Sequence, residues 1–190
     1  MAIGRPQKFD KDDLLDKSVD LIWREGPTAL SLNEIANRLG VAKPGLASRF
    51  GSKDDFLVAV LKHYHERLDG MVQTAIAEAD TVEAIARAYL GSYVTVLSSK
   101  PIGPETGCLL AATTEAFATK SDNIIADTAR VLNASTRAGL VQALHRADAA
   151  DPENLARYLY GQSVALAFLS RCGASSNELE DFVERALSVI

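Results

Sequence analysis

The chain has 190 residues, of which 47% are hydrophobic and 24% charged, and its formal net charge is −5 at pH 7. This apolar fraction can bury a core and the charged fraction is ordinary, so the composition excludes a disordered chain. No run of 18 apolar residues occurs and residues 1–20 lack an apolar signal segment, which predicts neither a membrane span nor export. The two cysteines are therefore expected to be reduced thiols in a cytoplasm.

The net charge is unevenly distributed along the chain. Residues 1–55 hold nine basic and nine acidic residues, so the remaining 11 basic and 16 acidic residues account for the whole −5. A local basic footprint matters more for DNA affinity than the sign of the whole chain. Any one of these basic residues taken alone could equally be a solvated surface charge. The positions able to approach phosphates are Arg5, Lys8, Lys43, Arg49 and Lys53.

Residues 31–56 contain two short helical patterns separated by a glycine turn. Ser31 and Glu34 have the spacing of a capping box, and apolar positions on one face follow them. Gly40 stands where the chain must turn left-handed, which a residue without Cβ does at little cost. Pro44 suits the first turn of the second helix, because its missing N–H would be unpaired there.

The second of these two helices has a small and basic outer face. Leu46 and Phe50 are four residues apart and form its inward stripe. Two short helices joined by a tight turn, the second with such a face, are typical of a helix-turn-helix that reads the DNA major groove. The residues left facing outward are Lys43, Gly45, Ala47, Ser48 and Arg49.

The rest of the chain shows helical periodicity and no strand pattern of useful length. The loop KPIGPETG, broken by prolines and glycines, precedes a short helix, CLLAATTEAFA. The helix that begins at Pro152 is expected to end at Gly173. The pattern predicts an all-α fold of about nine helices. Further helix starts are predicted at Ser52 with Asp55, Asp80 with Glu83, Ser121, Asp151-Pro152-Glu153, and Ser175 with Glu178.

Residues 10–65 resemble the DNA-binding domain of the tetracycline-repressor (TetR) family of bacterial transcription regulators. The segments that carry the resemblance are GRP with Phe9, LLDKSVDLIWREG, SLNEIANRLGVAKPGL and FGSKDDFLVAVL. Three positions depart from the family pattern. Pro27 and Ala47 replace common aromatics, which at Ala47 implies one missing phosphate contact, and Ala42 replaces a Ser or Thr, which implies a weaker helix cap.

The resemblance implies an N-terminal arm and helix-turn-helix domain in residues 1–51 and a helical effector-binding and dimerisation domain in residues 52–190. Its partner would be a near-palindromic double-stranded DNA operator, with the arm entering a minor groove. The DNA-binding residues expected on this basis are Arg5, Ser31, Lys43, Gly45, Ala47, Ser48, Arg49 and Lys53.

The segment YLYGQSVALAFLS, residues 158–170, is apolar on nearly all sides. A helix of this kind is buried all round, which in so small a domain favours a partner chain over a central helix of a monomer. The resemblance implies that residues 152–190 form a four-helix bundle across a twofold axis. The interface residues expected for this homodimer are Tyr158, Gly161, Ala165 and Phe168.

The effector site is less visible in the sequence. Tyr89 and Tyr93 lie one helical turn apart, where they could either line a cavity with a few polar groups or belong to the core. Thr113 and Phe117 of the short helix, with Thr114 and Glu115 beside them, leave the same two alternatives open. No ligand can be named from these residues.

The motif GCLL at 107–110 resembles a TetR subgroup in which this segment opens the sixth helix near the ligand cavity. That resemblance implies that Cys108 senses electrophiles or oxidants, and a helix N-terminus would stabilise the reactive thiolate. The alternative is that Cys108 is a small buried hydrophobic residue. Cys172 lies at a helix C-terminus and is expected to be inert.

No catalytic, metal-binding or cofactor site is predicted. His63 and His65 face different directions on a helix, His145 stands alone, and the motifs HExxH and CxxC and a phosphate-binding glycine loop are missing. The predicted function is therefore a homodimeric transcriptional repressor released from its operator by a small effector. The alternative is a helical small-molecule carrier or enzyme that does not bind DNA.

Overall fold

The computed structural model describes residues 10–99, 107–120 and 123–190, and within these ranges it contains nine α-helices and no strand. This confirms the predicted all-α class. Arg5, Lys8, Phe9, the loop residues 100–106 and the helix start at Ser121 lie outside the described residues. The helices are α1 (Lys11–Glu25), α2 (Leu32–Arg38), α3 (Lys43–Phe50), α4 (Lys53–Ala77), α5 (Val82–Ser98), α6 (Leu109–Ala116), α7 (Ile124–Arg146), α8 (Pro152–Arg171) and α9 (Ser176–Leu187).

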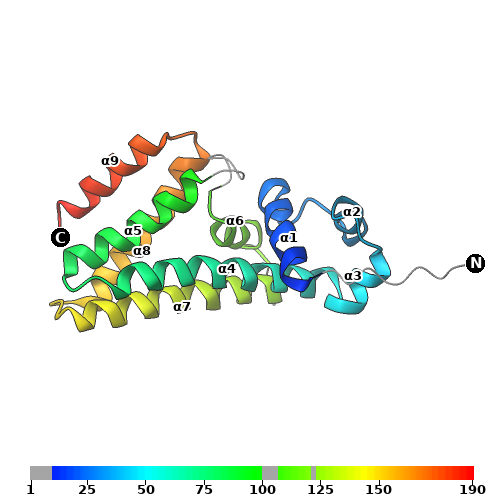
Figure 1. The fold of residues 1–190 in the computed structure, drawn as a ribbon, viewed down its shortest axis with the longest axis horizontal. Coiled ribbons are helices and arrows are strands. Elements are labelled where there is room, and N and C mark those ends of the chain that lie inside the picture. Colours follow the sequence, from blue (N-terminus) through cyan, green and yellow to red (C-terminus); the bar gives the residue numbers. More distant parts are fainter. Residues whose placement is uncertain (1–9, 100–106, 121–122) are drawn as a thin grey trace, which may run out of the picture.

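The molecule is elongated along its two longest helices. Figure 1 shows α4 and α7 side by side along most of the length, with α1–α3 at one end and α5, α8 and α9 at the other. The short helix α6 lies between these two parts, beside α1. We refer to α1–α3 as the head and to α5–α9 as the body, with α4 joining them.

The start signals of several helices are confirmed by hydrogen bonds. Reciprocal capping boxes form between Ser31 and Glu34, between Ser52 and Asp55, and between Ser175 and Glu178. These bonds satisfy backbone donors that have no partner within the helix. They also hold the pKa of Glu34, Asp55 and Glu178 below the ordinary carboxyl value.

Two helix ends differ from the sequence-based expectation. The N-cap of α5 is Thr81 rather than Asp80, because the Thr81 hydroxyl accepts a hydrogen bond of 3.2 Å from the Ala84 N–H. Helix α8 ends at Arg171, two residues before Gly173, which adopts φ +89°. The start of α8 is as predicted, since the Asp151 side chain accepts from the Asn154 N–H.

One continuous hydrophobic core runs through the head, α4 and the body. In the head, Ile35 and Leu46 are buried, and the rings of Phe50 and Phe56 meet edge to face at 5.4 Å. Because α4 contributes to the core of both parts, the division of the chain at residue 51 remains a prediction.

The head is also attached to α4 by an ionic contact. Asp16 of α1 lies 2.7 Å from Nε2 of His63 and 2.6 Å from Nη1 of Arg67. The hydrogen bond with His63 is the main reason why the pKa of Asp16 is lowered. Because Asp16 is half exposed, this contact positions α1 more than it stabilises the fold.

Candidate nucleic-acid interface and effector cavity

Helices α2 and α3 form the helix-turn-helix. The first helix is capped by Ser31, and the chain then reverses through Gly40 at φ +68°, where other residues would be strained. Leu46 anchors α3 in the head with only 2% of its surface exposed. The N-cap Ala42 makes no side-chain hydrogen bond, so the weaker cap expected there is confirmed.

The outer face of α3 is accessible and carries the basic residues expected there. Lys43, Gly45, Ser48 and Arg49 are exposed, and Ala47 is half-buried. The flanking residues are also accessible: Ser31 is exposed and Lys53, the first residue of α4, is half-buried. A helix presented this way can enter a major groove, with Lys53 near the backbone.

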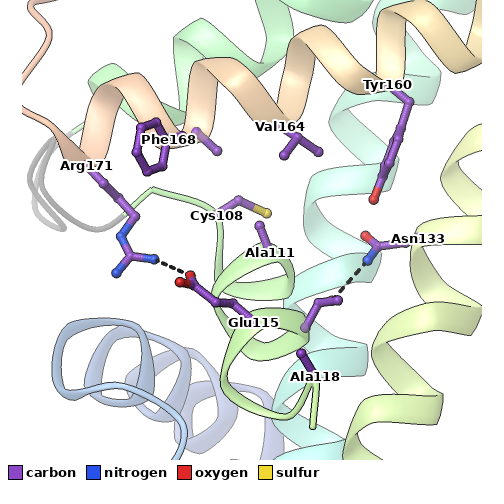
Figure 2. A pocket seen from close by; sticks show the side chains of 11 residues that line it. Cys108, Ala111, Glu115, Ala118, Asn133, Tyr160, Val164, Phe168 and Arg171 are labelled. Carbon is purple, nitrogen blue, oxygen red and sulfur yellow. Dashed lines mark hydrogen bonds and ion pairs between the residues drawn. The ribbon is translucent and has the colours of Figure 1, made fainter.

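A cavity of about 340 Å³ lies in the body between α6, α7 and α8. Figure 2 shows that Tyr160, Val164, Phe168 and Arg171 reach it from α8, and that Asn133 faces it from α7. Such a volume fits a small molecule, and a mostly apolar wall with a few polar groups is usual for ligand sites. The other lining residues are Cys108, Ala111, Thr114, Glu115, Ala118 and Ala167.

Most polar groups of the cavity are already paired with one another. The Asn133 amide donates to the Thr114 hydroxyl at 3.4 Å. Arg171 forms an exposed ion pair of 3.5 Å with Glu115, drawn as a dashed line in Figure 2. The guanidinium of Arg137 lies 5.2 Å from the ring centroid of Tyr160. An uncharged ligand could enter without breaking a buried ion pair.

Gly107 brings the chain close to α8 immediately before α6. It adopts φ +63°, and a Cβ at this position would lie 2.8 Å from the Ala167 carbonyl oxygen and 2.5 Å from Cγ of Arg171. Cys108 follows as the N-cap of α6, half-buried and on the cavity wall. Cys172, the C-cap of α8, is exposed.

We expect Gly107→Ala to destabilise the protein by about 2 kcal/mol, because the left-handed conformation and the contact with a backbone oxygen both penalise Cβ. The change in the free energy of unfolding is measured by urea denaturation monitored by circular dichroism. Gly70→Ala is the control, since a Cβ there would meet nothing within 4 Å. Equal unfolding midpoints for the two variants would contradict the assigned role of Gly107.

Four residues, two tyrosines of α5 and two residues at or near α6, were expected either to line the effector cavity or to belong to the core, and the structure places them differently. Tyr93 lines a small recess behind the cavity that also includes Cys108, and burial raises the pKa of Tyr93 well above its ordinary value. Tyr89 lies fully in the core, with its hydroxyl 3.4 Å from that of Ser163. Thr113 and Phe117 are buried and do not line this cavity or its recess. Their effector-binding role stays a prediction.

Residues 14–60 match the sequence profile of the bacterial regulatory proteins of the tetR family. This range covers the helix-turn-helix described above. The head of this chain is therefore similar to the corresponding region of the tetR-family regulatory proteins. Members of this family and the structural neighbours named below are transcription regulators rather than enzymes.

Two bacterial regulators are distant relatives of this chain. The HTH-type transcriptional repressor ComR of Escherichia coli (strain K12) is 31% identical over 108 residues, which is 56% of this chain and 50% of ComR. The chain thus spans about half the length of that relative. The uncharacterized HTH-type regulator YezE of Bacillus subtilis (strain 168) is 23% identical over 99% of this chain and 100% of YezE.

The fold is shared with solved TetR-family structures. One is a cysteine-substituted variant of the regulator CifR in complex with 26-base-pair double-stranded operator DNA. It is 23% identical, with a TM-score of 0.81 over 97% of this chain and 98% of that chain. This similarity shows that the body of this chain, as well as its head, shares the fold of that regulator.

The outer face of α8 is apolar and uncovered in the described part of a single chain. Phe168 is 66% exposed, Val164 is 42% exposed, and Gly161 continues the same stripe. Of the other expected interface residues, Ala165 is half-buried, and the Tyr158 hydroxyl donates to the Ala186 carbonyl of α9 at 2.9 Å. The stripe of Gly161, Val164 and Phe168 therefore has no covering element in the described part of a single chain.

No helix in the ranges 10–99, 107–120 and 123–190 is both long and apolar enough to cross a membrane. The same ranges hold no group of three or more His, Cys, Asp or Glu residues arranged to bind a metal ion.

Proposed function

We propose that this chain is a cytoplasmic homodimeric repressor of the TetR family that binds a near-palindromic operator through α3 and leaves it when a small effector occupies the body. The observation that carries this proposal is the exposed basic face of α3 on a capped helix-turn-helix. The operator complex of CifR and the repressor function named for ComR support the same partner and the same sign of control.

The dimer would form through α8. Solvent-exposed apolar side chains in a row mark an association surface when they are contiguous, and Val164 and Phe168 lie one turn apart. A twofold interface would place α8 of one protomer against α8 of the other, with the same residues contributed twice. Two heads would then meet the DNA on one face, about 34–36 Å apart in the DNA-binding state.

The cavity between α6, α7 and α8 would hold the effector. In this mechanism the dimer has two states that differ in the spacing of the two α3 helices. An effector shifts the equilibrium only by the difference of its affinities for the two states. Because Phe168 belongs both to the cavity wall and to the exposed stripe of α8, an occupant of the cavity would act close to the subunit interface.

Within this function, the GCLL motif would make Cys108 a sensing thiol. Its support is that Sγ lines the cavity at the start of α6 and accepts a hydrogen bond from the Tyr64 hydroxyl at 3.5 Å. A reagent that fits the cavity would meet Sγ on its wall. The competing role of Cys108 is packing, with the effector held without a covalent bond.

Competitive alkylation at neutral pH, read by peptide mass, distinguishes these two roles. We expect Cys108 to label faster than Cys172, although Cys172 is the more exposed residue, and we expect labelled protein to bind its operator more weakly. Faster labelling of Cys172, with Cys108 protected in the native protein, would make Cys108 a packing residue.

The proposed function itself is tested by a mobility shift of duplex DNA at several salt concentrations. A repressor that contacts phosphates loses affinity steeply as salt rises. A helical carrier or enzyme would give no shift at any salt concentration.

A further inference from the structure

Tyr64 of α4 contacts both a residue of the cavity wall, Cys108, and a residue of the head, Trp23. It is 5% exposed, and its hydroxyl donates to Sγ of Cys108 at 3.5 Å. Its ring meets the ring of Trp23 edge to face, with centroids 5.0 Å apart and an interplanar angle of 76°. One residue thus contacts the start of α6 and the last turns of α1.

Burial makes the Tyr64 hydroxyl sensitive to its partner. Burial raises the pKa of Tyr64 well above its ordinary value, and the neighbouring Cys108 acts in the same direction, so the phenol stays protonated and able to donate. A buried hydroxyl that loses its acceptor destabilises the protein unless it finds another partner. A change at Cys108 therefore alters the hydrogen bonding of the Tyr64 hydroxyl.

Helix α6 also borders the head directly. A second cavity of about 390 Å³ separates the C-terminal end of α1, residues 23–27, from α6. Glu115 and Arg171 line both this second cavity and the effector cavity, and they are joined by their ion pair. This second cavity therefore leaves unfilled space between the end of α1 and α6.

We propose that Tyr64 is a positioning residue that couples the state of the Cys108 cavity to the orientation of the DNA-binding head. This inference rests on the proposed function and adds the residues through which the two sites communicate. When an occupant or a modification takes Sγ away from the Tyr64 hydroxyl, the phenol ring moves to a new partner. Because packed rings do not deform continuously, Trp23 then repacks and α1 changes its angle against α4.

A second contact between α1 and α4 determines how α1 would move. Asp16 remains bonded to His63 and Arg67, two turns before Trp23 on α1. A displacement at Trp23 consequently tilts α1 about the Asp16 contact instead of detaching it. Since α2 and α3 pack on α1 and α4 within one core, the tilt moves the reading face of α3.

Trp23 is the only tryptophan of the chain, so its fluorescence reports this contact directly. The experiment uses the full-length chain with Cys172→Ser, and iodoacetamide as the probe. The reagent forms an S–C bond at Cys108 as its C–I bond breaks, iodide leaves, and the thiol proton passes to buffer. Emission of Trp23 and affinity for a selected duplex are measured before and after alkylation.

Tyr64→Phe is the decisive variant, because it keeps the ring against Trp23 and removes only the hydroxyl. Tyr160→Phe is the matched control, since Tyr160 lines the same cavity and is remote from α1 in sequence and on a different helix. We expect alkylation to shift Trp23 emission and weaken DNA binding by roughly 5- to 150-fold in the parent and in Tyr160→Phe. In Tyr64→Phe, alkylation should change neither quantity.

The same coupling can be tested without a reagent, in case the Cys108 thiol does not react with iodoacetamide. Cys108→Ala removes the acceptor genetically, and it should shift Trp23 emission in the parent but add nothing in the presence of Tyr64→Phe. Equal responses of Tyr64→Phe and the parent, or additive effects of the two substitutions, would overturn the coupling. If the parent binds no DNA at all, the proposed function fails, while the emission measurement still decides the role of Tyr64.

Discussion

Phe168→Glu is expected to separate the two protomers and abolish operator binding while each protomer keeps its fold. Phe168 is 66% exposed in a single chain, so a carboxylate there remains hydrated and costs the monomer little. At a twofold α8 interface the same carboxylate would be buried twice without a partner. An uncompensated buried charge costs about 3–5 kcal/mol, which is enough to dissociate a micromolar dimer.

Val131→Glu is the matched control for this experiment. Val131 of α7 is also 66% exposed, so it tests whether any new charge on an exposed apolar position disturbs the protein. Ala165→Glu is less informative, because Ala165 is half-buried and its loss of dimer could follow from unfolding. Analytical ultracentrifugation at micromolar concentration measures the oligomeric state of both variants. A monomeric parent protein, or a dimeric Phe168→Glu variant, would show that α8 is not the interface.

Arg49→Ala is expected to cost about 1–3 kcal/mol in binding to the specific operator and to relax the base preference at one position. Arg49 is exposed near the end of α3, where a guanidinium can pair with both acceptors of a guanine edge. Gly45 and Ala47 leave little side-chain bulk on α3, so few direct base contacts are expected and DNA shape should contribute more to the readout.

Lys53→Ala should behave differently, because Lys53 is the first residue of α4 and is placed to neutralise a phosphate. It should weaken binding to all DNA sequences alike. It should also reduce, by about one unit, the steepness with which the logarithm of the binding constant falls with the logarithm of the salt concentration. Arg130→Ala on α7, in the body and outside the proposed dimer interface, is the neutral control. Anisotropy titrations of specific and scrambled duplexes separate the cases. Equal losses on both duplexes for Arg49→Ala and Lys53→Ala would remove Arg49 from base readout.

The helix-turn-helix could be predicted from the sequence because its determinants are local. A capping box spans four residues, the left-handed turn needs one glycine, and the inward stripe of α3 repeats after four positions. Each of these signals lies within a few residues of the structure that it specifies. The start of α5 was predicted one residue too early: Asp80 was expected as the N-cap, and the N-cap is Thr81. Both residue types can cap a helix, so the sequence does not distinguish two adjacent candidates.

The effector cavity could be predicted only in part, because its wall is made by packing. Helical periodicity placed Tyr89 and Tyr93 on one face but could not say that only Tyr93 would reach the recess beside Cys108. Asn133 and Tyr160 carried no distinguishing pattern in the sequence, since their function depends on the crossing of α7 and α8. Contacts across many residues, such as Trp23 with Tyr64, follow from tertiary structure alone.

The central claim, that this chain is a sequence-specific DNA-binding regulator, is tested most directly by selection of bound duplexes from a random pool, followed by sequencing and titration in salt. We expect an enriched near-palindromic motif with half-sites about one helical turn, or a multiple of it, apart. The logarithm of the affinity should fall linearly with the logarithm of the salt concentration. Recovery of no preferred sequence, or no retention of DNA even at low salt, would contradict it.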